Sequence, residues 1–208
     1  MINKLICTTL AIFLCQGPAA FSQETVKEYY PTGELKAEGE QQNGQKTGLW
    51  QIYYPDGTLN ARLTWLNGQL HGECSYYDFE GNLQMKEHWQ EDMLNGTAVE
   101  FYTSGQIKRT GQYINGCYEG KWIFFYEDGT LRQEGNYHEG LPHGTWKAWN
   151  ERGGIQQEGE YKNAREHGLW HFYDANGRLK FEGSYTNGNK TGTWYRVKRN
   201  GKKKEIDY

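Results

Sequence analysis

The histidines are the side chains of this sequence that could most readily hold a metal ion, because imidazole is a common zinc ligand. His71, His143 and His167 each directly precede a glycine, at intervals of 72 and 24 residues. The glycine spacing described below places such equivalent positions on repeats of two strands, about 9.6 Å from one another. Zinc ligands lie about 2.1 Å from the metal. We therefore predict that these histidines occupy one equivalent loop position of the repeat and do not form a metal site.

Two cysteines follow residue 22, and a disulfide between them is the redox chemistry to consider. Cys74 and Cys117 fall in different repeats, three to four predicted strands apart, which is about 15 Å or more at ordinary strand spacing. A disulfide needs Cα atoms within about 7 Å of each other. The spacing predicts that both thiols are free in the monomer.

Acidic residues recur with the same period and raise the question of a catalytic pair. Glu134, Glu158 and Glu182 alternate with Lys or Arg along the polar face of the repeats. A glycosidase needs two carboxylates singled out in a cleft, with unequal pKa values, whereas repeated acids that face bases are typical of cross-strand charge pairs. The sequence has no nucleophile motif, phosphate-binding glycine loop or zinc signature. We predict that the protein is not an enzyme and has no catalytic residue, metal or cofactor.

The composition favours an extended β architecture over a thick globular core. Leu, Ile, Val and Phe supply only 35 of the 208 residues, while the chain has 8 Trp, 16 Tyr and 27 Gly. A low aliphatic content is typical of disorder, but disordered chains are also poor in aromatic residues. The formal net charge of −3 becomes −4 when Lys4 is removed with residues 1–22. This balance provides no overall basic surface for nucleic acid.

Glycines recur every 24 residues and define the organisation of the chain. One series consists of Gly33, Gly57, Gly81, Gly105, Gly129, Gly153, Gly177 and Gly201. A second consists of Gly48, Gly72, Gly96, Gly120, Gly144, Gly168 and Gly192. Less complete series begin at Gly39 and Gly44. A fixed period of this length indicates a repeat protein.

Apolar residues keep the same phase as the glycines. Leu or Ile stands two residues after each of the first seven glycines of the first series, from Leu35 to Leu179, and an aromatic residue stands four residues before each. Two residues after each glycine of the second series come Trp50, Trp122, Trp146, Trp170 and Trp194, with Cys74 and Ala98 as the exceptions. The whole unit therefore recurs in register.

Each unit is predicted to be a β-hairpin. Pairs such as Asp56-Gly57 and Asn176-Gly177 lie between apolar runs, which is a strong signal for a two-residue turn. After each turn the residues alternate with period two, so that Leu131 and Gln133 share one face while Arg132 points to the other. The predicted fold class is all-β: an elongated, single-layer antiparallel meander of tandem hairpins, with about 15 strands over about 70 Å.

The turn geometry sets the predicted register. With a two-residue turn, Trp122 falls opposite Gly135 and Trp170 opposite Gly183, where an indole would cover backbone that glycine exposes. A three-residue bulged loop would shift that register. The second connection, as in residues 67–72, is predicted to be a slightly longer loop.

The C-terminal basic cluster, residues 197–204, forms the last predicted hairpin. Its lysines are expected to protect an open sheet edge from further pairing. Contact with an anionic surface is the alternative.

The N-terminus is predicted to be a cleaved signal peptide of residues 1–22. Lys4 gives a short positive start, an apolar run extends from Leu5 to Leu14, and Ala20 and Ser22 fit a small-residue cleavage site. The run is shorter than the roughly 20 apolar residues of a membrane span. Residues 23–208 would then be an exported array of seven to eight repeats, in the periplasm, in the envelope or secreted. Lipidation at Cys15 is the alternative, which Leu14 before it disfavours.

Units such as residues 134–146, Glu-Gly-Asn-Tyr-His-Glu-Gly-Leu-Pro-His-Gly-Thr-Trp, resemble the MORN repeat in its bacterial variant, which often carries the label of an antitoxin repeat. The resemblance covers essentially all of residues 24–201. It implies an elongated antiparallel hairpin array that binds proteins or membranes, and it does not imply catalysis. Because the chain is predicted to leave the cytoplasm, an antitoxin role would take the form of immunity against an exported toxin.

The predicted function is that of an exported protein-binding scaffold. Its predicted binding face is an aromatic ladder of Trp50, Trp122, Trp146, Trp170, Trp194, Tyr113, Tyr137, Tyr161 and Tyr185. Aromatic residues are enriched at protein interfaces, but these rings could equally be the hydrophobic mass of a thin sheet. A cell-envelope glycan binder that uses the same ladder is the alternative function. Membrane-surface contact is weakened by the net negative charge.

Overall fold

The structure, a computed structural model, describes residues 23–207, and its regular elements in that range are 17 β-strands joined in one sheet. They are β1 (Gln23–Tyr29), β2 (Leu35–Gln42), β3 (Gln45–Tyr53), β4 (Leu59–Leu66), β5 (Gln69–Leu70), β6 (Gly72–Tyr77), β7 (Leu83–Gln90), β8 (Met93–Phe101), β9 (Ile107–Ile114), β10 (Cys117–Phe125), β11 (Leu131–His138), β12 (Leu141–Trp149), β13 (Ile155–Lys162), β14 (Arg165–Tyr173), β15 (Leu179–Thr186), β16 (Asn189–Val197) and β17 (Lys203–Ile206). Within this range, none of the elements is a helix that could cross a membrane.

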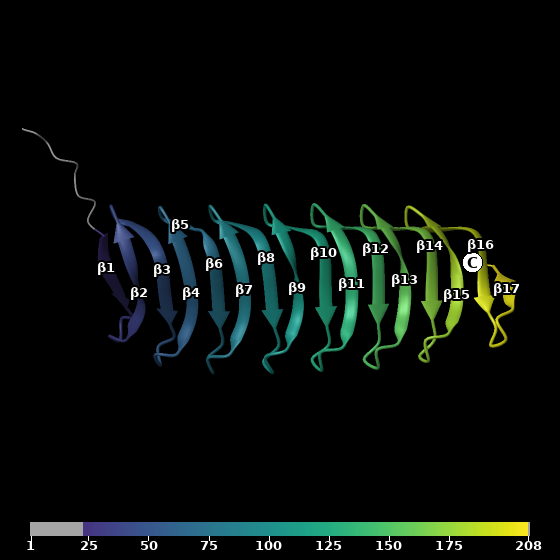
Figure 1. Ribbon diagram of the computed structural model, residues 1–208, viewed down its shortest axis with the longest axis horizontal. Coiled ribbons are helices and arrows are strands. Elements are labelled where there is room, and N and C mark those ends of the chain that lie inside the picture. Colours follow the sequence, from purple (N-terminus) through teal and green to yellow (C-terminus); the bar gives the residue numbers. More distant parts are fainter. Residues whose placement is uncertain (1–22, 208) are drawn as a thin grey trace, which may run out of the picture.

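Strands that follow each other in the sequence pair antiparallel, except that the short β5 and β6 both pair with β4, so the sheet is an open meander along the long axis of the molecule (Figure 1). This confirms the predicted fold class. The prediction of about 15 strands was low, because β1 adds half a hairpin before the first turn glycine and His71 separates the short β5 from β6. The predicted signal peptide, residues 1–22, lies outside the described residues.

The Asp-Gly connections are three-residue bulged loops, the alternative to the two-residue turn on which the predicted register was based. In the loop after β10, the Gly129 amide donates to the carbonyl of Tyr126 and the Tyr126 amide donates to the carbonyl of Thr130. This is a type I turn followed by a residue in the left-handed region, here Gly129 at φ +84°. The carboxylate of Asp128 accepts a hydrogen bond from the amide of Thr130, which fixes the loop locally.

A β-bulge next to each of these loops restores the register that the longer loop would have shifted. Phe125 pairs with Leu131, but Phe124 pairs with Gln133, so Arg132 is the extra residue. Beyond the bulge, Trp122 stands opposite Gly135 and Trp170 stands opposite Gly183. The predicted pairing is therefore confirmed, although the loop that produces it differs from the prediction.

The Asn-Gly connections at the other edge are the tight turns, where the sequence predicted a longer loop. Leu66 pairs with Gln69 across Asn67 and Gly68, which have φ of +50° and +80°. Both central residues are left-handed, as a type I′ turn requires, and its twist matches that of the flanking strands. Successive turns are joined by hydrogen bonds, such as the one from the Gly68 amide to the carbonyl of Lys46.

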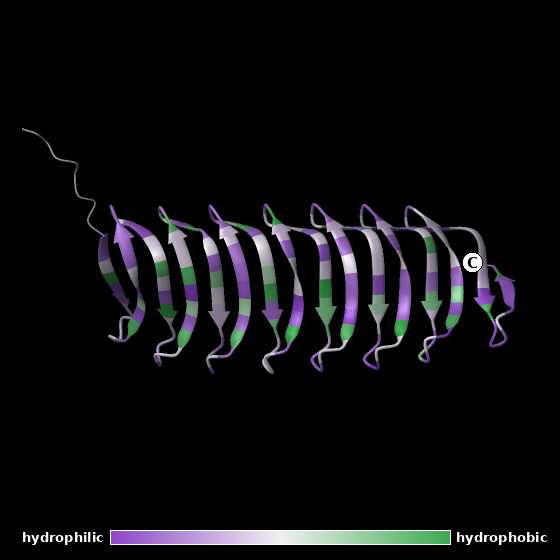
Figure 2. Ribbon diagram, viewed as in Figure 1, coloured by the Kyte–Doolittle hydropathy of each residue, from purple (hydrophilic) through white to green (hydrophobic). Residues whose placement is uncertain are grey.

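A row of tyrosines joins each repeat to the next at the loop edge. The hydroxyl of Tyr54 donates to the carbonyl of Tyr77, at 2.9 Å, and Tyr30, Tyr102 and Tyr126 make the equivalent bond 23 residues ahead. Figure 2 shows the Leu and Ile positions that begin the strands after these loops as apolar colour at the loop edge. This edge therefore carries a second apolar layer beside the tryptophan layer.

Candidate functional site

The tryptophans that recur with the 24-residue period lie at β-bulges, which direct their side chains over the preceding strand. In β3, Glu40 of β2 pairs with Thr47 and Glu38 pairs with Gln51, so a single residue, Gly39, faces three residues of β3. Gly48 lies in this bulge at φ +64°. The bulge displaces the indole of Trp50 along the strand and onto Gly39.

Each indole covers the glycine eleven residues earlier, not the glycine opposite it in the following strand. A Cβ added to Gly39, Gly111, Gly135, Gly159 or Gly183 would lie within 3.0 Å of the ring of Trp50, Trp122, Trp146, Trp170 or Trp194 respectively. The prediction that each indole lies on the following glycine is therefore wrong, although the backbone register was right. The bulge decides the direction, because it aims the side chain back across the earlier strand.

Hydrogen bonds and covering side chains hold the indoles in place. Trp50 Nε1 donates to the carbonyl of Glu40 at 2.9 Å, and Trp122, Trp170 and Trp194 make the equivalent bond to the residue ten positions earlier. The side chain four residues before the tryptophan covers the outer ring face: Lys46 Nζ lies 3.8 Å from the centroid of Trp50. Four of the five indoles are consequently at most 3% exposed.

Ring contacts connect the C-terminal half into one continuous row, which we name the aromatic spine. It consists of Tyr113, Tyr118, Trp122, Tyr137, Trp146, Tyr161, Trp170, Tyr185 and Trp194, with ring centroids 3.9–6.1 Å apart along the row. Most neighbours meet edge to face, the arrangement that the ring quadrupoles favour. The structure thus brings together eight of the nine predicted ladder residues, and Trp50 lies apart from them near the other end of the sheet.

Two repeats depart from this pattern. In them a small residue replaces the tryptophan, and a large residue replaces the glycine that the tryptophan would cover. Cys74 and Ala98 take the tryptophan position, and both are buried. Eleven residues before them, where the other repeats have glycine, stand Leu63 and Glu87. A small residue at one position is therefore matched by a large one at the other, so the space between the strands stays filled.

Glu87 brings a carboxylate into this interior row. It is 8% exposed, stands opposite Cys74 and Ala98, and accepts a hydrogen bond from Trp89 Nε1 at 3.2 Å. Burial raises the pKa of Glu87, and it also raises the pKa of nearby Tyr76 to about 12. A perturbed carboxyl is one mark of a functional site, but no second perturbed acid of matching geometry accompanies it among the described residues.

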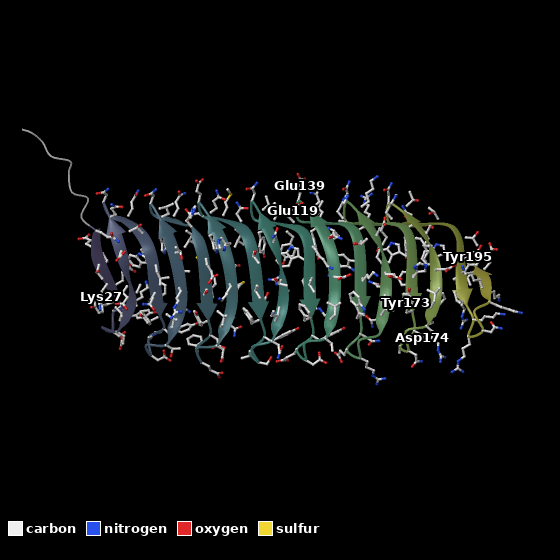
Figure 3. All side chains as sticks on the ribbon, viewed as in Figure 1. Lys27, Glu119, Glu139, Tyr173, Asp174 and Tyr195 are labelled. Atoms are coloured by element: carbon white, nitrogen blue, oxygen red, sulfur yellow. The ribbon has the colours of Figure 1, made fainter. Side chains whose placement is uncertain are left out.

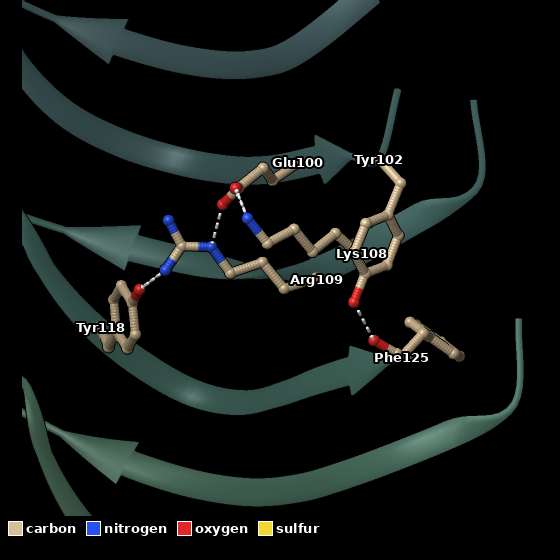
Figure 4. Close-up of polar contacts among 6 residues, drawn as sticks. All are labelled: Glu100, Tyr102, Lys108, Arg109, Tyr118 and Phe125. Atoms are coloured by element: carbon tan, nitrogen blue, oxygen red, sulfur yellow. Dashed lines mark hydrogen bonds and ion pairs between the residues drawn. The ribbon is translucent and has the colours of Figure 1, made fainter. Parts of the chain in front are cut away.

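A charged cluster lies where the interrupted repeats meet the spine (Figure 4). Arg109 donates to both the carboxylate of Glu100 and the hydroxyl of Tyr118, and Lys108 Nζ lies 2.6 Å from Glu100. Burial alone would raise the pKa of Glu100, but the hydrogen bonds from Lys108 and Arg109 lower it overall. The guanidinium of Arg109 also lies 6.0 Å from the centroid of the Trp122 ring, so the charged cluster contacts the N-terminal end of the aromatic spine.

The opposite face of the sheet carries a ladder of alternating charges. Lys121 pairs with Glu134 at 2.7 Å, Lys147 pairs with Glu158 at 3.1 Å, and Lys203 pairs with Glu182. The predicted cross-strand pairing of these three acids is confirmed. Burial and a 2.6 Å hydrogen bond to Glu158 raise the pKa of Tyr173, labelled in Figure 3, to about 12. These acids are structural, because each is held by a base on another strand. Lys121 and Lys147 lie on the adjacent strand, whereas Lys203 of β17 reaches Glu182 of β15 across β16.

The edge formed by the tight turns carries apolar side chains in the middle repeats, which we name the turn-edge stripe. It consists of Leu66, Met93, Ile114, Cys117 and Leu141, on the turns that join β4 to β5, β7 to β8, β9 to β10 and β11 to β12. Leu66, Met93, Ile114 and Leu141 are each 47–50% exposed, and Figure 2 shows apolar colour along this edge between β5 and β9. Exposed apolar side chains that recur on neighbouring turns make this edge a candidate interaction site.

Polar residues close the turn-edge stripe at its ends. The equivalent turn positions are Gln42 and Gln45 before it, and Lys162 and Arg165 after it. Glu119 of β10 and Glu139 of the turn between β11 and β12, both labelled in Figure 3, lie two residues from Cys117 and Leu141, and Glu119 accepts hydrogen bonds from the Glu139 amide and from His138. The sequence pattern did not predict this stripe, because Asn and Gly at these turns indicate a backbone conformation and do not indicate the exposure of the residues beside them.

The residues first considered for chemistry lie apart from one another. Cys74 is buried and Cys117 is exposed, and both are free thiols. Within residues 23–207, no group of three or more His, Cys, Asp or Glu side chains is arranged to hold a metal ion. His138 has an ionic partner: its hydrogen bond with Glu119 raises the pKa of the imidazole.

Comparisons with known proteins identify the repeat. A family model described as "MORN repeat variant" matches residues 25–43, 46–67, 70–91, 94–115, 118–139, 142–163 and 166–187. Each matched segment begins in one tight turn or its strand and ends in the next, in agreement with the hairpin period. No curated protein sequence matches the chain.

Solved structures give only remote likenesses. A GtfA/B complex bound to UDP and GlcNAc is 13% identical over 55% of this chain and 23% of its own, with a TM-score of 0.25. A TcdB2-TccC3-Cdc42 structure is 13% identical over 84% of this chain and 13% of its own (TM-score 0.19), and a porin-like protein from Bacteroides uniformis is 10% identical over 89% and 94% (TM-score 0.21). The chain thus spans less than a quarter of the first two. Such scores support no inference about function.

Proposed function

The chain belongs to the MORN repeat variant family, and from that premise we propose that it is an exported, non-enzymatic scaffold that binds another protein along its turn edge. MORN repeats are repeat-based binding modules. The turn-edge stripe is the observation that carries the more specific proposal. It offers about half-exposed apolar side chains on four consecutive turns, and these turns are about 9.6 Å apart.

A protein partner fits the turn-edge stripe better than a glycan does. Glycan recognition by an aromatic ladder would need open ring faces, and Trp50, Trp122 and Trp170 are at most 1% exposed, with their faces against glycine backbone. The stripe instead offers aliphatic and thioether side chains with a polar rim, which is the usual layout of a protein interface. Met93 adds an adaptable side chain of the kind found at binding surfaces. The half-buried tyrosines of the aromatic spine would support the sheet beneath such an interface.

The experiment that tests this proposal replaces the turn-edge stripe and measures capture of partners. We expect the variant Met93→Ser/Ile114→Ser/Leu141→Ser to lose its binding to proteins of the cell envelope, measured by cross-linking and mass spectrometry on the purified chain. Loss of three half-buried anchors typically costs more than about 1 kcal/mol each where they sit at the centre of an interface. Far-ultraviolet circular dichroism of the variant checks that the sheet is intact.

The matched control is the variant Leu49→Ser/Leu169→Ser. These two leucines are 52% and 53% exposed but lie within β3 and β14, away from the tight turns. We expect this control to keep its partners. If both variants lose partner capture equally, the binding depends on general surface hydrophobicity and not on the turn-edge stripe. Saturable sugar binding that Trp146→Ala abolishes, with no protein captured, would favour the glycan alternative.

Export is part of the proposal and rests on the N-terminal sequence. Lys4, the apolar run to Leu14 and the small residues at Ala20 and Ser22 support cleavage before Gln23, where β1 begins. Mass spectrometry of the protein from separated cell fractions tests it. A mature terminus at Gln23 outside the cytoplasm is the expected result, and an intact Met1 in the cytoplasm would contradict it.

A further inference from the structure

The two ends of the sheet are open within the described residues. β1 pairs there only with β2, and β17 pairs only with β16. Each end strand therefore leaves one row of backbone amides and carbonyls without a strand partner in residues 23–207. Such an edge is a template for pairing with another chain.

The two edges occupy successive places in the repeat. β17 pairs with β16 as β15 pairs with β14: Ile206 stands opposite Trp194 as Gly183 stands opposite Trp170. β1 pairs with β2 as β14 pairs with β15, with Val26 opposite Gly39. β1 is therefore the kind of strand that follows β17 in the array.

We propose that the array continues end to end between two copies of this chain, with β17 of one copy antiparallel to β1 of a second copy. The register follows from the pairing of β15 with β16, where Phe181 faces Arg196 and Glu182 faces Tyr195. Lys204 and Glu205 take the places of Phe181 and Glu182.

On the second copy, Glu28 and Lys27 take the places of Arg196 and Tyr195. Lys204 then lies opposite Glu28, and Glu205 lies opposite Lys27. The register that the array itself uses therefore produces two opposite-charge pairs, which stabilise adjacent strands.

The apolar layer also continues through this junction. In the array, each tryptophan covers the glycine of the strand before it. At the junction Val26 takes the tryptophan position and Ile206 takes the glycine position. Two side chains of medium size, Val26 and Ile206, then fill the space that a tryptophan and a glycine fill elsewhere. Cys74 and Leu63 make a comparable substitution within the chain.

The long-range charge distribution favours this orientation. Residues 23–177 carry 13 Lys and Arg against 23 Asp and Glu, a net charge of −10, while residues 178–207 carry nine against three, a net charge of +6. The N-terminal hairpin, residues 23–42, has five acids and two bases. Opposite fields at the two ends steer copies head to tail.

The basic end contains a like-charge pair that an acid of a second copy would relieve. Arg196 and Lys204 stand directly opposite each other in β16 and β17 and line a groove of about 1010 Å³ together with Arg178, Lys180, Lys198 and Arg199. Like charges directly opposite are unfavourable. Glu28 of the second copy would lie beside Lys204 and offset this repulsion.

The same lysines disfavour the competing tail-to-tail contact. Two copies of β17 would bring Lys203 and Lys204 against each other's basic cluster. The predicted role of these lysines as edge protection thus applies to like edges, whereas the acidic edge of β1 is complementary. A head-to-tail contact is heterologous, and because this one continues the long axis of the sheet, it extends to further copies.

The experiment is a charge exchange measured by sedimentation velocity and light scattering. The purified protein, with its N-terminus determined by mass spectrometry, is expected to have a weight-average mass that rises with concentration to at least about twice the monomer mass, and to fall back at high salt. The variant Lys204→Glu/Glu205→Lys places like charges opposite Glu28 and Lys27, and we expect it to remain monomeric. The variant Lys27→Glu/Glu28→Lys should do the same.

Combining the two variants restores opposite charges in both pairs and should restore assembly, although net charge is the same in all four proteins. Lys27 also pairs with Glu38 at 3.2 Å, and Glu28 pairs with Lys46 at 3.0 Å, so thermal unfolding of each variant checks that the hairpin stays folded. A wild-type monomer at all concentrations would overturn the proposal. So would a fixed dimer that only the C-terminal exchange abolishes, or a combined variant that fails to reassemble while remaining folded. Because the turn-edge stripe is not part of this junction, its triple serine variant should still assemble.

Discussion

The aromatic spine and the repeats of residues 59–101 solve one packing problem in two ways. In the spine, a large indole at positions such as Trp170 lies on the bare backbone of a glycine such as Gly159. In residues 59–101, buried Cys74 and Ala98 follow Leu63 and Glu87 at the same separation of eleven residues. The repeat therefore conserves the combined volume of a pair of positions and not the identity of either one. The pair is the unit of packing, because it spans two strands that touch.

The largest effect should come from removing an indole of the spine. We expect Trp170→Ala to lower the free energy of unfolding by about 3–5 kcal/mol, because a buried ring is lost and a cavity remains. Its hydrogen bond to the Glu160 carbonyl is lost as well. Cys74→Ala, at the same repeat position in the other region, should cost much less. Urea unfolding followed by circular dichroism measures both, and equal losses would remove the distinction between the regions.

The next effect should come from adding one carbon to the glycine beneath that indole. In Gly159→Ala the new Cβ would lie within 3.0 Å of the Trp170 ring. Overpacking of this kind costs about 1–3 kcal/mol. The control Gln157→Ala, two residues earlier on the same strand face, should change stability by less than about 0.5 kcal/mol. A Gly159→Ala protein as stable as its control would show that the indole does not depend on close approach.

Copying the exchange of the other region into the spine should couple the two positions. The double variant Gly159→Leu/Trp170→Cys reproduces the pair formed by Leu63 and Cys74. We expect the double variant to lose less free energy of unfolding than the two single variants lose together. The expected difference is about 0.5–3 kcal/mol, the range for residues in contact. A complete double-mutant cycle by chemical denaturation measures this coupling. Strict additivity would contradict the view that the pair is the unit of packing.

The smallest effect should be a pH dependence confined to residues 59–101. Burial raises the pKa of Glu87, so the folded state binds its proton more tightly than the unfolded state does. The stabilising contribution is therefore fully present below the ordinary pKa of Glu and is lost as the pH rises through the raised value. Glu87→Gln should remove this dependence and unfold at a higher temperature than wild type at pH 7, measured by calorimetry between pH 4 and 8.

A second carboxyl provides the opposite sign as the control for that experiment. The hydrogen bond from Tyr173 lowers the pKa of Glu158 below its ordinary range. Its contribution is present above the ordinary pKa of Glu and is lost as the pH falls through the lowered value. Glu158→Gln should therefore lose stability at neutral pH. The two variants shifting in the same direction would be incompatible with the placement of one carboxyl in the interior row and the other in the charge ladder.

Much of the fold follows from local patterns in the sequence. The 24-residue period, the alternation after Gly129 and the repeated acids at Glu134 and Glu158 were enough to predict the meander, its faces and its charge pairs, because each depends on residues close in sequence or directly opposite in a hairpin. The turn types were exchanged in the prediction. Asp-Gly and Asn-Gly both permit a two-residue turn, and the choice depends on the bulge beside Phe125 and the stacking of successive turns.

The candidate site was the part that local patterns could not locate. The aromatic ladder was predicted as a binding face, yet Trp50 and Trp122 are buried by the bulge, the covering side chain and the preceding strand, each of which acts across strands. One signal in the sequence could have revealed this. Ala98 is followed by Gly111 and Cys74 is preceded by Leu63, so the size exchange only balances when each tryptophan is paired with the earlier position.

The sequence by itself determined that this protein is a hairpin array with one period, two unlike edges and a charge asymmetry between its ends. Only the tertiary structure decided which rings are interior, where an exposed apolar stripe remains, and that Lys204 and Glu28 occupy successive places in a common register. The physical reason is the direction of the contacts. Turn and strand propensities act within a hairpin, whereas burial and edge complementarity depend on how bulges aim side chains across strands that come from different repeats.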